Sequence, residues 1–200
     1  MRDKTRAARE EAIAEAAYRL LEARGFGGVS MLNVAKAAKA SNETLYRWYG
    51  DKVGLFAALV KRNAEEARTL LDEAETGASA LQTLGRFGPV LLHVVTGARA
   101  VALNRAAAAE PSGALGQAIA KEGREDIAPR LVMLLGKLDA EGVARITEPA
   151  KAAEIYFNLL IGDWQIRRAI GVLAEPSEEQ RQARAQTALD AFLMLYPPAP

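Results

Sequence analysis

The stretch that decides the fold runs from Ser41 to Lys52 and reads S-N-E-T-L-Y-R-W-Y-G-D-K. Ser41 is a good helix N-cap, because its hydroxyl can accept a hydrogen bond from an unpaired backbone N–H of the helix that follows. Leu45 and Trp48 lie three residues apart and give this helix an apolar face to bury. Gly50 then ends it. The stretch therefore predicts a short helix with a polar outer face.

A second helix is expected directly after the first. Asp51 can cap it, and Lys52 lies in its first turn, beside unpaired N–H groups and the positive end of the helix dipole. Such a helix start suits a phosphate group.

The residues before Ser41 complete a two-helix unit. Ser30 can cap a helix over residues 31–38, and Lys39-Ala40 leave only a tight turn before Ser41. Two short helices joined in this way form a helix-turn-helix, whose second helix reaches base edges of DNA with its first turns. In this sequence those turns carry the polar residues Asn42, Glu43, Thr44 and Arg47. The spacing therefore predicts a DNA-binding unit.

A longer helix is expected upstream. Its apolar stripe follows helical spacing and consists of Ile13, Ala16, Ala17, Leu20 and Leu21. Gly25 is placed to end it in a Schellman motif, with Phe26 against Leu21.

Residues from about 9 to 59 resemble the DNA-binding domain of the tetracycline-repressor (TetR) family, a match that covers a quarter of the chain. The family pattern has a glycine after the first helix, a Ser/Thr-capped helix, and a Ser-x-x-Thr-Leu-Tyr-x-x-aromatic segment followed by lysine. The matching positions are Gly25, Ser30, Ser41, Thr44, Leu45, Tyr46, Tyr49 and Lys52. The resemblance implies that Tyr46 and Lys52 bind phosphates and that Thr44 and its neighbours face the groove. The expected DNA-binding residues are Ser30, Ser41, Asn42, Glu43, Thr44, Tyr46, Arg47, Tyr49 and Lys52.

Three positions depart from the family pattern. Lys39 stands where a turn glycine is usual, Glu43 where a small residue is common, and Trp48 where histidine is common. Lys39 costs turn strain if its backbone is left-handed. Glu43 repels phosphate but can accept from the N4 amine of cytosine, so it affects the operator sequence more than DNA binding itself.

The charge distribution agrees with a DNA-binding amino-terminal part. Residues 1–62 carry 12 Lys and Arg against 7 Asp and Glu, whereas residues 63–200 carry 14 against 18. A basic surface suits phosphate binding. The lead-in with Arg2, Lys4, Arg6 and Arg9 can track the DNA backbone or a minor groove, and it fits a solvated, disordered tail about as well.

Composition excludes several other classes. Zero cysteines exclude disulfides and thiolate metal sites, and His93, the single histidine, has no second histidine with which to share a metal. We expect no metal and no cofactor, and His93 is expected to be a buried, hydrogen-bonded core residue. No catalytic residue is expected, since a Gly-x-Ser-x-Gly elbow is also absent. No segment resembles a signal peptide or a bilayer-spanning run, so a cytoplasmic location without membrane contact is expected.

The whole chain is predicted to be all-α, because alanine-rich segments with helical spacing continue to its end. We expect a helix-turn-helix DNA-binding domain over residues 1–50 and a larger helical ligand-binding and dimerisation domain over 51–196. A flexible tail is expected over 197–200. One unbroken helix from Asp51 to about Ala74 would connect the two domains, and another is expected over 149–170.

The last two helices are candidates for a dimer interface, and the resemblance implies that such helices from two subunits form a four-helix bundle. One short recognition helix reads few base pairs, so a two-fold homodimer with two half-sites is expected. The candidate residues are Ile155, Leu159, Ile170, Ala185, Leu189 and Phe192, with Trp164 and Tyr196 on the same apolar faces. Ordinary core packing within one subunit is an equally good reading of each position.

The resemblance also implies a ligand cavity enclosed by the middle helices. Candidate lining residues are Phe87, Leu91, Leu103, Met133, Tyr156 and Trp164, with His93, Arg99 and Asn158 as polar contacts, although core packing is the commoner role for such residues. The implied function is a regulator, most often a repressor, that binds a palindromic double-stranded DNA operator as a homodimer and is released by a small apolar or amphipathic effector. The alternative is a protein-interaction module of the same fold that does not bind DNA.

Overall fold

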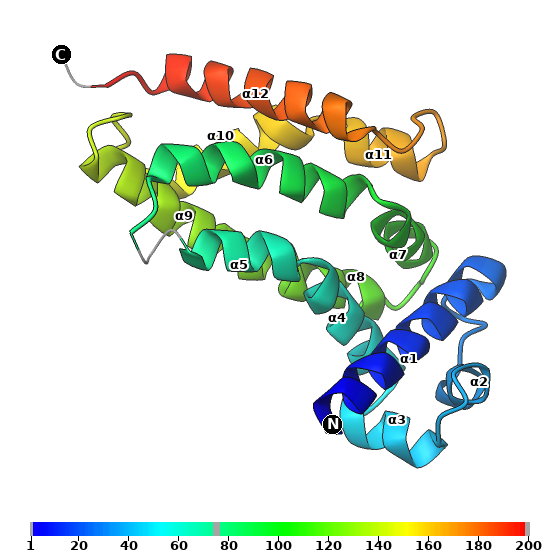
Figure 1. Cartoon of the computed structure of the whole chain (residues 1–200). Coiled ribbons are helices and arrows are strands. Elements are labelled where there is room, and N and C mark those ends of the chain that lie inside the picture. Colours follow the sequence, from blue (N-terminus) through cyan, green and yellow to red (C-terminus); the bar gives the residue numbers. More distant parts are fainter. Residues whose placement is uncertain (1, 74–76, 199–200) are drawn as a thin grey trace. The chain divides into compact units, whose positions relative to one another are not determined.

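The computed structural model describes residues 2–73 and 77–198, with side chains from Arg6 onward. Within these residues the chain is helical and contains no strand, which confirms the all-α prediction. The chain divides into two compact units (Figure 1). The first contains the residues up to Arg62 together with Ala102–Glu122, and the second contains Asn63–Val101 together with the residues from Gly123 onward.

The first unit is built on four consecutive helices that share one apolar core. They are α1 (Arg2–Arg24), α2 (Met31–Ala37), α3 (Asn42–Tyr49) and α4 (Lys52–Asn63). Phe26 and Phe56 meet edge to face with ring centroids 5.5 Å apart. At the end of α1 the Gly25 N–H donates to the Leu21 carbonyl at 2.9 Å, with a φ of 63° at Gly25. That bond belongs to the single-bond left-handed helix ending and not to the Schellman motif that the sequence predicted.

A later part of the chain also belongs to the first unit. It comprises the larger part of α7 (Ala98–Ala108) and all of α8 (Ala114–Glu122). Leu103, Ala106 and Leu115 are buried in the same cluster as Ile13 and Phe56. No pattern in the sequence predicted this grouping, because it depends on contacts between residues far apart in the chain.

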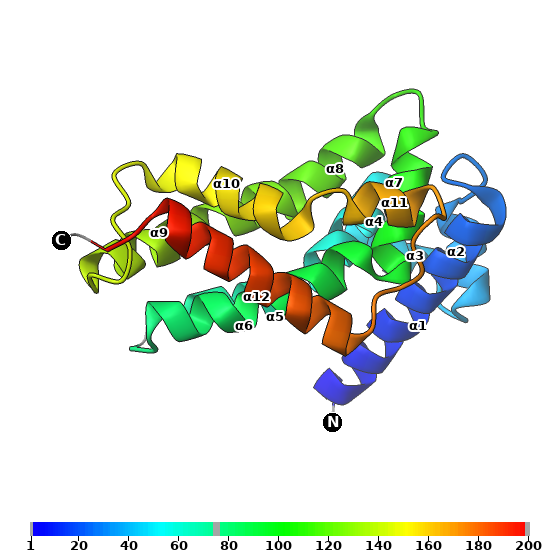
Figure 2. The ribbon, with the colours of Figure 1, turned by 90° about the horizontal axis from the view of Figure 1, so that it is seen from above.

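Among the described residues, the second unit contains six complete helices and the first residues of α7. The complete helices are α5 (Glu65–Glu73), α6 (Ala80–Thr96), α9 (Arg124–Ala140), α10 (Pro149–Ile161), α11 (Trp164–Ala169) and α12 (Glu178–Leu195). Helix α6 packs against α12, and α10 packs against both α9 and α12 (Figure 2). Helix α5 closes the unit by packing against α6 and α9.

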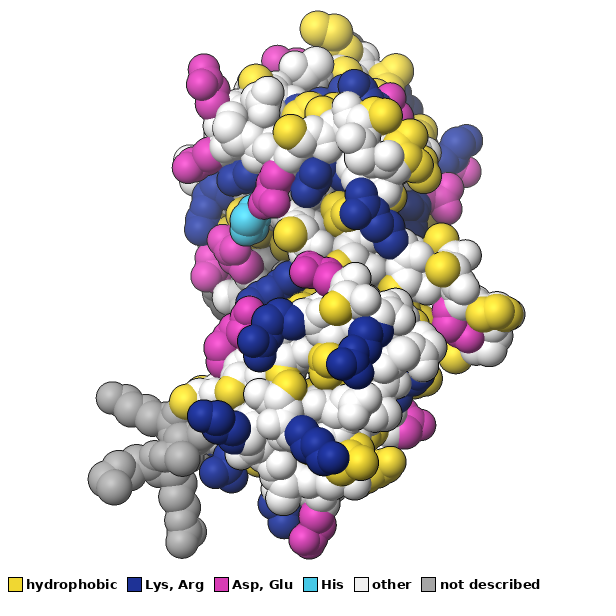
Figure 3. Space-filling model, turned by 90° about the vertical axis from the view of Figure 1, so that its right-hand side faces the viewer, with side chains coloured by type: hydrophobic (Ala, Val, Ile, Leu, Met, Phe, Trp, Pro, Cys, Tyr) yellow, Lys and Arg dark blue, Asp and Glu magenta, His cyan; other side chains and the backbone are white. Residues whose placement is uncertain are grey.

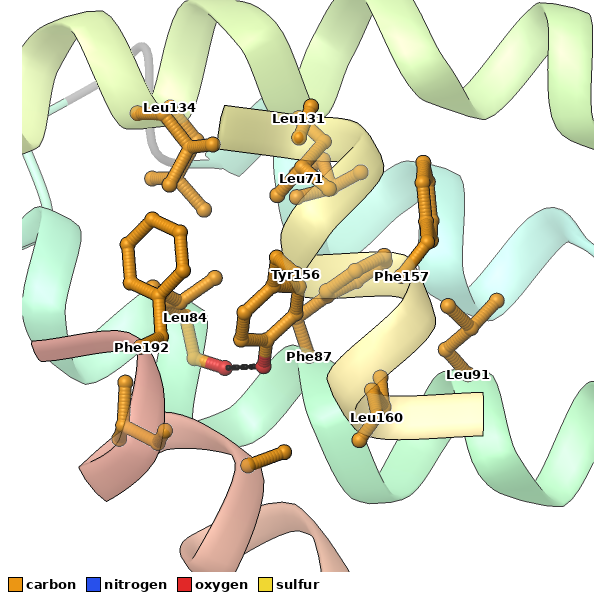
Figure 4. Close-up of a cluster of buried hydrophobic side chains, with 14 of the residues drawn as sticks. Leu71, Leu84, Phe87, Leu91, Leu131, Leu134, Tyr156, Phe157, Leu160 and Phe192 are labelled. Atoms are coloured by element: carbon orange, nitrogen blue, oxygen red, sulfur yellow. Dashed lines mark hydrogen bonds between the residues drawn. The ribbon is translucent and has the colours of Figure 1, made fainter. Parts of the chain in front are cut away.

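Aromatic rings form the centre of the second unit (Figure 4). Tyr156 of α10 is fully buried, with its ring stacked 6.5 Å from Phe87 of α6 and edge-on 5.5 Å from Phe192 of α12. Its hydroxyl donates to the Leu84 carbonyl at 3.3 Å. Burial raises the pKa of Tyr156, so the phenol stays neutral.

Two helices expected to be continuous are broken. The prediction of one unbroken helix from Asp51 to about Ala74 is wrong, because α4 ends at Asn63 and α5 begins at Glu65. Asn63 has low helix propensity, and Glu65 and Glu66 place acidic side chains beside the unpaired N–H groups that start α5.

The second break lies at Gly162, within the helix expected over 149–170. Gly162 has a φ of 50° and follows the last residue of α10. Arg184 of α12 donates to the carbonyls of Leu159 and Leu160 at 2.8 and 2.9 Å, so a side chain satisfies carbonyls that a continued helix would have bonded.

A charged network joins α5 to α9. Arg68 is 7% exposed, donates to Asp126 at 2.7 Å and also pairs with Glu65. Arg130 bonds both Asp126 (3.0 Å) and Asp72 (2.8 Å). Burial alone would raise the pKa of Asp126, but the hydrogen bond and charge of Arg68, followed by those of Arg130, lower it below its usual value.

The carboxyl-terminal segment is attached to the second unit where the structure describes it. The Pro197 carbonyl accepts from the Arg145 N–H at 3.1 Å, so the first residue of the expected flexible tail is bound. Residues 199–200 of that tail lie outside the described range. Across the described residues no single helix meets the length and apolarity that a membrane span requires; α6 and α7 meet them only as a pair bent by 52°.

Candidate nucleic-acid interface

Both short helices of the helix-turn-helix begin at the serines that the sequence predicted. Ser30 accepts from the Asn33 N–H at 3.2 Å, and Ser41 accepts from the Thr44 N–H at 3.1 Å. The hydroxyls of Ser41 and Thr44 are also hydrogen-bonded, at 2.7 Å. These bonds satisfy orphan N–H groups and hold α3 as a short, capped helix after a tight turn.

Helix α3 separates into a buried and an exposed face. Leu45 is fully buried, and Thr44 is only 8% exposed. Asn42, Glu43, Tyr46 and Arg47 are exposed, as are the capping residues Ser30 and Ser41. Thr44 is therefore a buried partner of the Ser41 cap, and not the groove-facing residue that the resemblance predicted. The exposed face offers an amide, a carboxylate, a phenol and a guanidinium, which are groups that bind base edges and phosphates.

The last turn of α3 packs against α1. The Arg6 guanidinium lies 5.3 Å from the centre of the Trp48 ring, and Trp48 meets Tyr49 edge to face at 6.3 Å. Both aromatic side chains are half-buried. Burial, followed by the charge of Glu10, raises the pKa of Tyr49. Tyr49 thus serves to anchor the helix as well as being a candidate DNA contact.

Lys52 has a partner inside the first unit. Its ammonium donates to the Phe26 carbonyl at 2.8 Å and lies 4.0 Å from the centre of the Phe26 ring. An ammonium has three donors, so this bond leaves capacity for a phosphate. Asp51 accepts from the Gly54 N–H at 2.7 Å, as expected of the residue that caps α4.

The structure also identifies residues of this site that the sequence did not predict. A Cβ at Gly54 would clash with the Tyr49 carbonyl oxygen, so glycine allows the start of α4 to approach the end of α3 closely. A glycine in the first turn of a helix is the available signal for such an approach. The Phe26 carbonyl, as acceptor for Lys52, has no sequence signal at all.

Basic side chains lie on the surface of the first unit. Lys36, Lys39, Arg47 and Arg9 are exposed, and Arg6 pairs with Glu10 at 2.8 Å. Lys and Arg side chains (dark blue) are spread over the lower part of the face in Figure 3, which belongs to this unit. Helix α1 begins at Arg2, so the lead-in is helical and not a disordered tail. The side chains of Arg2 and Lys4 lie outside the described set.

The candidate ligand residues do not form one group. Phe87, Leu91 and Tyr156 are buried together in the core of the second unit, with half-buried Trp164 packed against it. Leu103 lies in the core of the first unit. Met133 is 53% exposed, Asn158 and His93 are exposed, and Arg99 is half-buried. The expectation of a buried His93 is therefore wrong; it lies on the outer side of α6, a position that apolar periodicity alone did not identify.

The candidate dimer residues are divided between core and surface. Ala185, Leu189 and Phe192 are at most 7% exposed and pack in the core of the second unit, where α12 meets α6. Ile155 and Leu159 are half-buried, and Ile170 is 63% exposed. The first three residues are thus core positions of one subunit, and the apolar stripe of α12 faces its own unit.

Two family sequence models match the chain. The one described as bacterial regulatory proteins of the tetR family matches residues 13–59, and the one described as the C-terminal domain of an AefR-like transcriptional repressor matches residues 82–198. Among curated proteins there is no significant match.

Solved structures agree with these matches. A TetR transcriptional regulator from Agrobacterium tumefaciens is 31% identical, with a TM-score of 0.73 and 94% of each chain covered. The flavonoid-responsive regulator FrrA is 28% identical, with a TM-score of 0.67, covering 96% of this chain and 98% of its own. A TetR-family regulator from Mesorhizobium loti, 24% identical with a TM-score of 0.74 over 95% of this chain and 97% of its own, shares the fold. Together with the capped helix-turn-helix and its exposed polar face, these matches show that the chain belongs to the TetR family of DNA-binding transcriptional regulators and is not an enzyme.

Proposed function

We propose that this protein is a cytoplasmic repressor that binds a palindromic operator as a homodimer and is released by a small apolar or amphipathic effector. The observation that carries the proposal is the outer face of α3, where Asn42, Glu43, Tyr46 and Arg47 are exposed on a helix capped by Ser41. A single helix of 8 residues reads few base pairs, so two copies related by a two-fold axis are needed for a specific site.

The base contacts are assigned to the first two residues of α3. Asn42 carries an amide that can bind adenine N6 and N7 together, and the Glu43 carboxylate can accept from cytosine N4. Tyr46 lies one turn further along and is 51% exposed, which suits a phosphate contact. Lys52 adds a second phosphate contact from the start of α4, through the donors that the Phe26 carbonyl does not use.

Dimerisation is assigned to the outer surfaces of α10 and α12, which pack against each other. With Ala185, Leu189 and Phe192 buried in the core, the available residues of α12 are Ala183, Thr187 and Met194, which follow helical spacing and are exposed. Met194 is 81% exposed. On α10, half-buried Ile155 and Leu159 remain candidates. Ile155→Glu is expected to give monomers in sedimentation, whereas Glu22→Gln, at an exposed position of α1 in the first unit, should leave the dimer intact.

The effector site is assigned to the aromatic part of the second core. Phe87, Leu91 and Tyr156 lie together there, with Trp164 at its edge. Among the buried residues that the structure describes in this unit, the charged one is Arg68, which is paired with carboxylates. An effector that enters among Phe87, Leu91 and Tyr156 therefore meets mainly apolar surface with neutral hydroxyl groups, which favours an uncharged group at that end of the effector. The flavonoid-responsive relative makes flavonoids the first compounds to screen.

Effector binding is proposed to act on the DNA-binding unit through α5 and α4. The Arg68–Asp126 pair holds α5 against α9. Helix α4 directly precedes α5 in the chain, and Ala64 alone separates them. A shift of α5 would move α4 and change the separation of the two recognition helices in the dimer. Coupling of this type is typically about 1–3 kcal/mol, which is enough for a useful switch.

The first experiment is selection of bound sequences from a random duplex pool by the purified protein, at two salt concentrations. A palindromic motif whose binding falls with salt supports the proposal. No enriched motif at either salt contradicts it and favours a protein-interaction role instead. Asn42→Ala and Glu43→Ala should each change preference at one base position by about 1–3 kcal/mol, whereas Glu22→Ala, an exposed site on α1, should leave the motif unchanged.

The regulatory direction needs a second measurement. The selected operator is placed before a reporter gene, and transcription is measured with and without a flavonoid that raises the melting temperature of the protein. Repression that the compound relieves supports the proposal, while transcription that requires the protein identifies an activator.

A further inference from the structure

The turn between α2 and α3 contains a strained lysine. Lys39 has a φ of 52° and is the one non-glycine residue with a positive φ among the residues that the structure describes. Its N–H donates to the Lys36 carbonyl at 3.3 Å, and the Ala40 N–H donates to the Ala35 carbonyl at 2.9 Å. This pair of bonds is the Schellman ending of a helix, which requires a left-handed residue and usually has glycine there. A side chain at this position therefore carries a conformational cost.

The lysine side chain lies on the surface near the residues that read bases. Lys39 is exposed and precedes Asn42 by three residues. A chain of three residues spans at most about 11 Å, whereas the major groove is about 12 Å wide between its rows of phosphates. When Asn42 contacts a base edge, Lys39 lies within one groove width of the phosphate backbone.

The negative charge of Glu43 makes a nearby cation favourable for phosphate binding on this side of α3. Between residues 31 and 50 the charged residues are Lys36, Lys39, Glu43 and Arg47. Glu43 lies in the first turn of α3, where its carboxylate is repelled by phosphates. Arg47 lies one turn further along, so Lys36 and Lys39 are the cations of this segment that precede the first turn.

We propose that Lys39 is a phosphate-binding residue, which holds its ammonium at the edge of the groove from a left-handed turn position. The inference rests on the proposed DNA-binding function and adds a contact to it. It has a consequence that an ordinary surface lysine would not have: Lys39→Gly removes both the strain and the charge, so it stabilises the protein while it weakens DNA binding.

The test compares four variants on one duplex. The probe is the sequence enriched in the selection, or a non-specific duplex at low salt. Lys39→Gln removes the charge and keeps the strained side chain, Lys39→Gly removes both, and Lys39→Arg keeps both. Lys121→Gln, at an exposed lysine of α8 outside the helix-turn-helix, is the matched control for charge.

Each phosphate contact contributes about 0.9 to the slope of log affinity against log salt. Lys39→Gln and Lys39→Gly should therefore bind the duplex more weakly than wild type at low salt. The ratio of wild-type to variant affinity should fall about 3.5-fold when the salt concentration rises fourfold. Lys39→Arg and Lys121→Gln should keep the wild-type slope. Lys39→Gly should also melt about 2–4 °C higher than wild type.

The contrary results are distinct. Wild-type salt slopes in both Lys39→Gln and Lys39→Gly, with DNA binding intact, overturn the inference alone. A wild-type protein whose binding to duplex DNA is absent or independent of salt overturns the proposed function and the inference together.

Discussion

Gly88 lies where α6 crosses two other helices, and its replacement by alanine gives a sharp test of the second core. A Cβ at this position would lie 2.8 Å from the Cβ of Ala185, 3.2 Å from the Tyr156 hydroxyl and 3.4 Å from a methyl group of Leu160. Overpacking a close-packed core in this way costs about 1–3 kcal/mol. The next residue is Pro89, whose ring also disfavours a helical residue with a Cβ before it.

The opposing term is helix propensity. Alanine is better than glycine in a helix interior by about 1 kcal/mol. We therefore expect Gly88→Ala to destabilise the second unit by about 1–2 kcal/mol, since the clash involves α10 and α12 as well as the pre-proline position. Gly85→Ala is the matched control in the same helix, because its Cβ would meet only a Leu189 methyl at 3.8 Å. That variant should be more stable than wild type by about 0.5–1 kcal/mol.

Unfolding can be followed in the second unit by itself. The chain has two tryptophans, Trp48 in the first unit and Trp164 in the second. In a Trp48→Phe background, Trp164 fluorescence reports urea or thermal unfolding of the second unit. Gly88→Ala should melt about 2–8 °C lower than this background and Gly85→Ala about 1–4 °C higher. Equal stability of the two variants, or a gain in Gly88→Ala, would refute the close approach of α6, α10 and α12.

Three further predictions concern single residues. Because the pKa of Asp126 is lowered in the folded state, its contribution is present above the usual pKa of an aspartate and is lost as pH falls through the lower folded value. Asp126→Asn should therefore lower the free energy of unfolding, measured by urea denaturation at neutral pH, by about 1–3 kcal/mol. It should also flatten the dependence of that free energy on acid pH, and an unchanged acid dependence would contradict the assignment. Ser41→Ala should cost about 1 kcal/mol of stability in the first unit, measured by thermal denaturation, and an unchanged melting temperature would argue against the cap. Lys52→Met should reduce stability, because it removes the bond to the Phe26 carbonyl. It should also weaken binding to two unrelated duplexes by the same factor, because it removes a phosphate contact, and a changed sequence preference would contradict that role.

Features that depend on neighbouring residues were accessible from the sequence. The caps at Ser30 and Ser41 follow from side chains and N–H groups three residues apart, and both bonds are present. The strain expected at Lys39 was conditional on a left-handed backbone, and its φ of 52° meets that condition. The helix expected over residues 31–38 and the helix expected between Ser41 and Gly50 likewise correspond to α2 and α3.

Features that depend on distant residues were not accessible. Thr44 is buried because α3 packs on the first core, and periodicity on a helix of 8 residues does not separate that face from the DNA face. The apolar stripe with Leu189 and Phe192 indicated a buried face, but the sequence does not say whether its partner is α6 or a second subunit. The end of α10 at Gly162 is completed by Arg184, which comes 22 residues later in the chain.

The presence of residues 102–122 in the first unit changes how the protein can be divided. The chain passes between the two units three times, after Arg62, after Val101 and after Glu122, and α7 continues through the second of these points as one helix. A fragment that stops at Arg62 would lack Leu103, Ala106 and Leu115, and would expose the apolar surface that they cover. The DNA-binding unit is therefore not one continuous amino-terminal segment, and three covalent connections, instead of one, join it to the second unit.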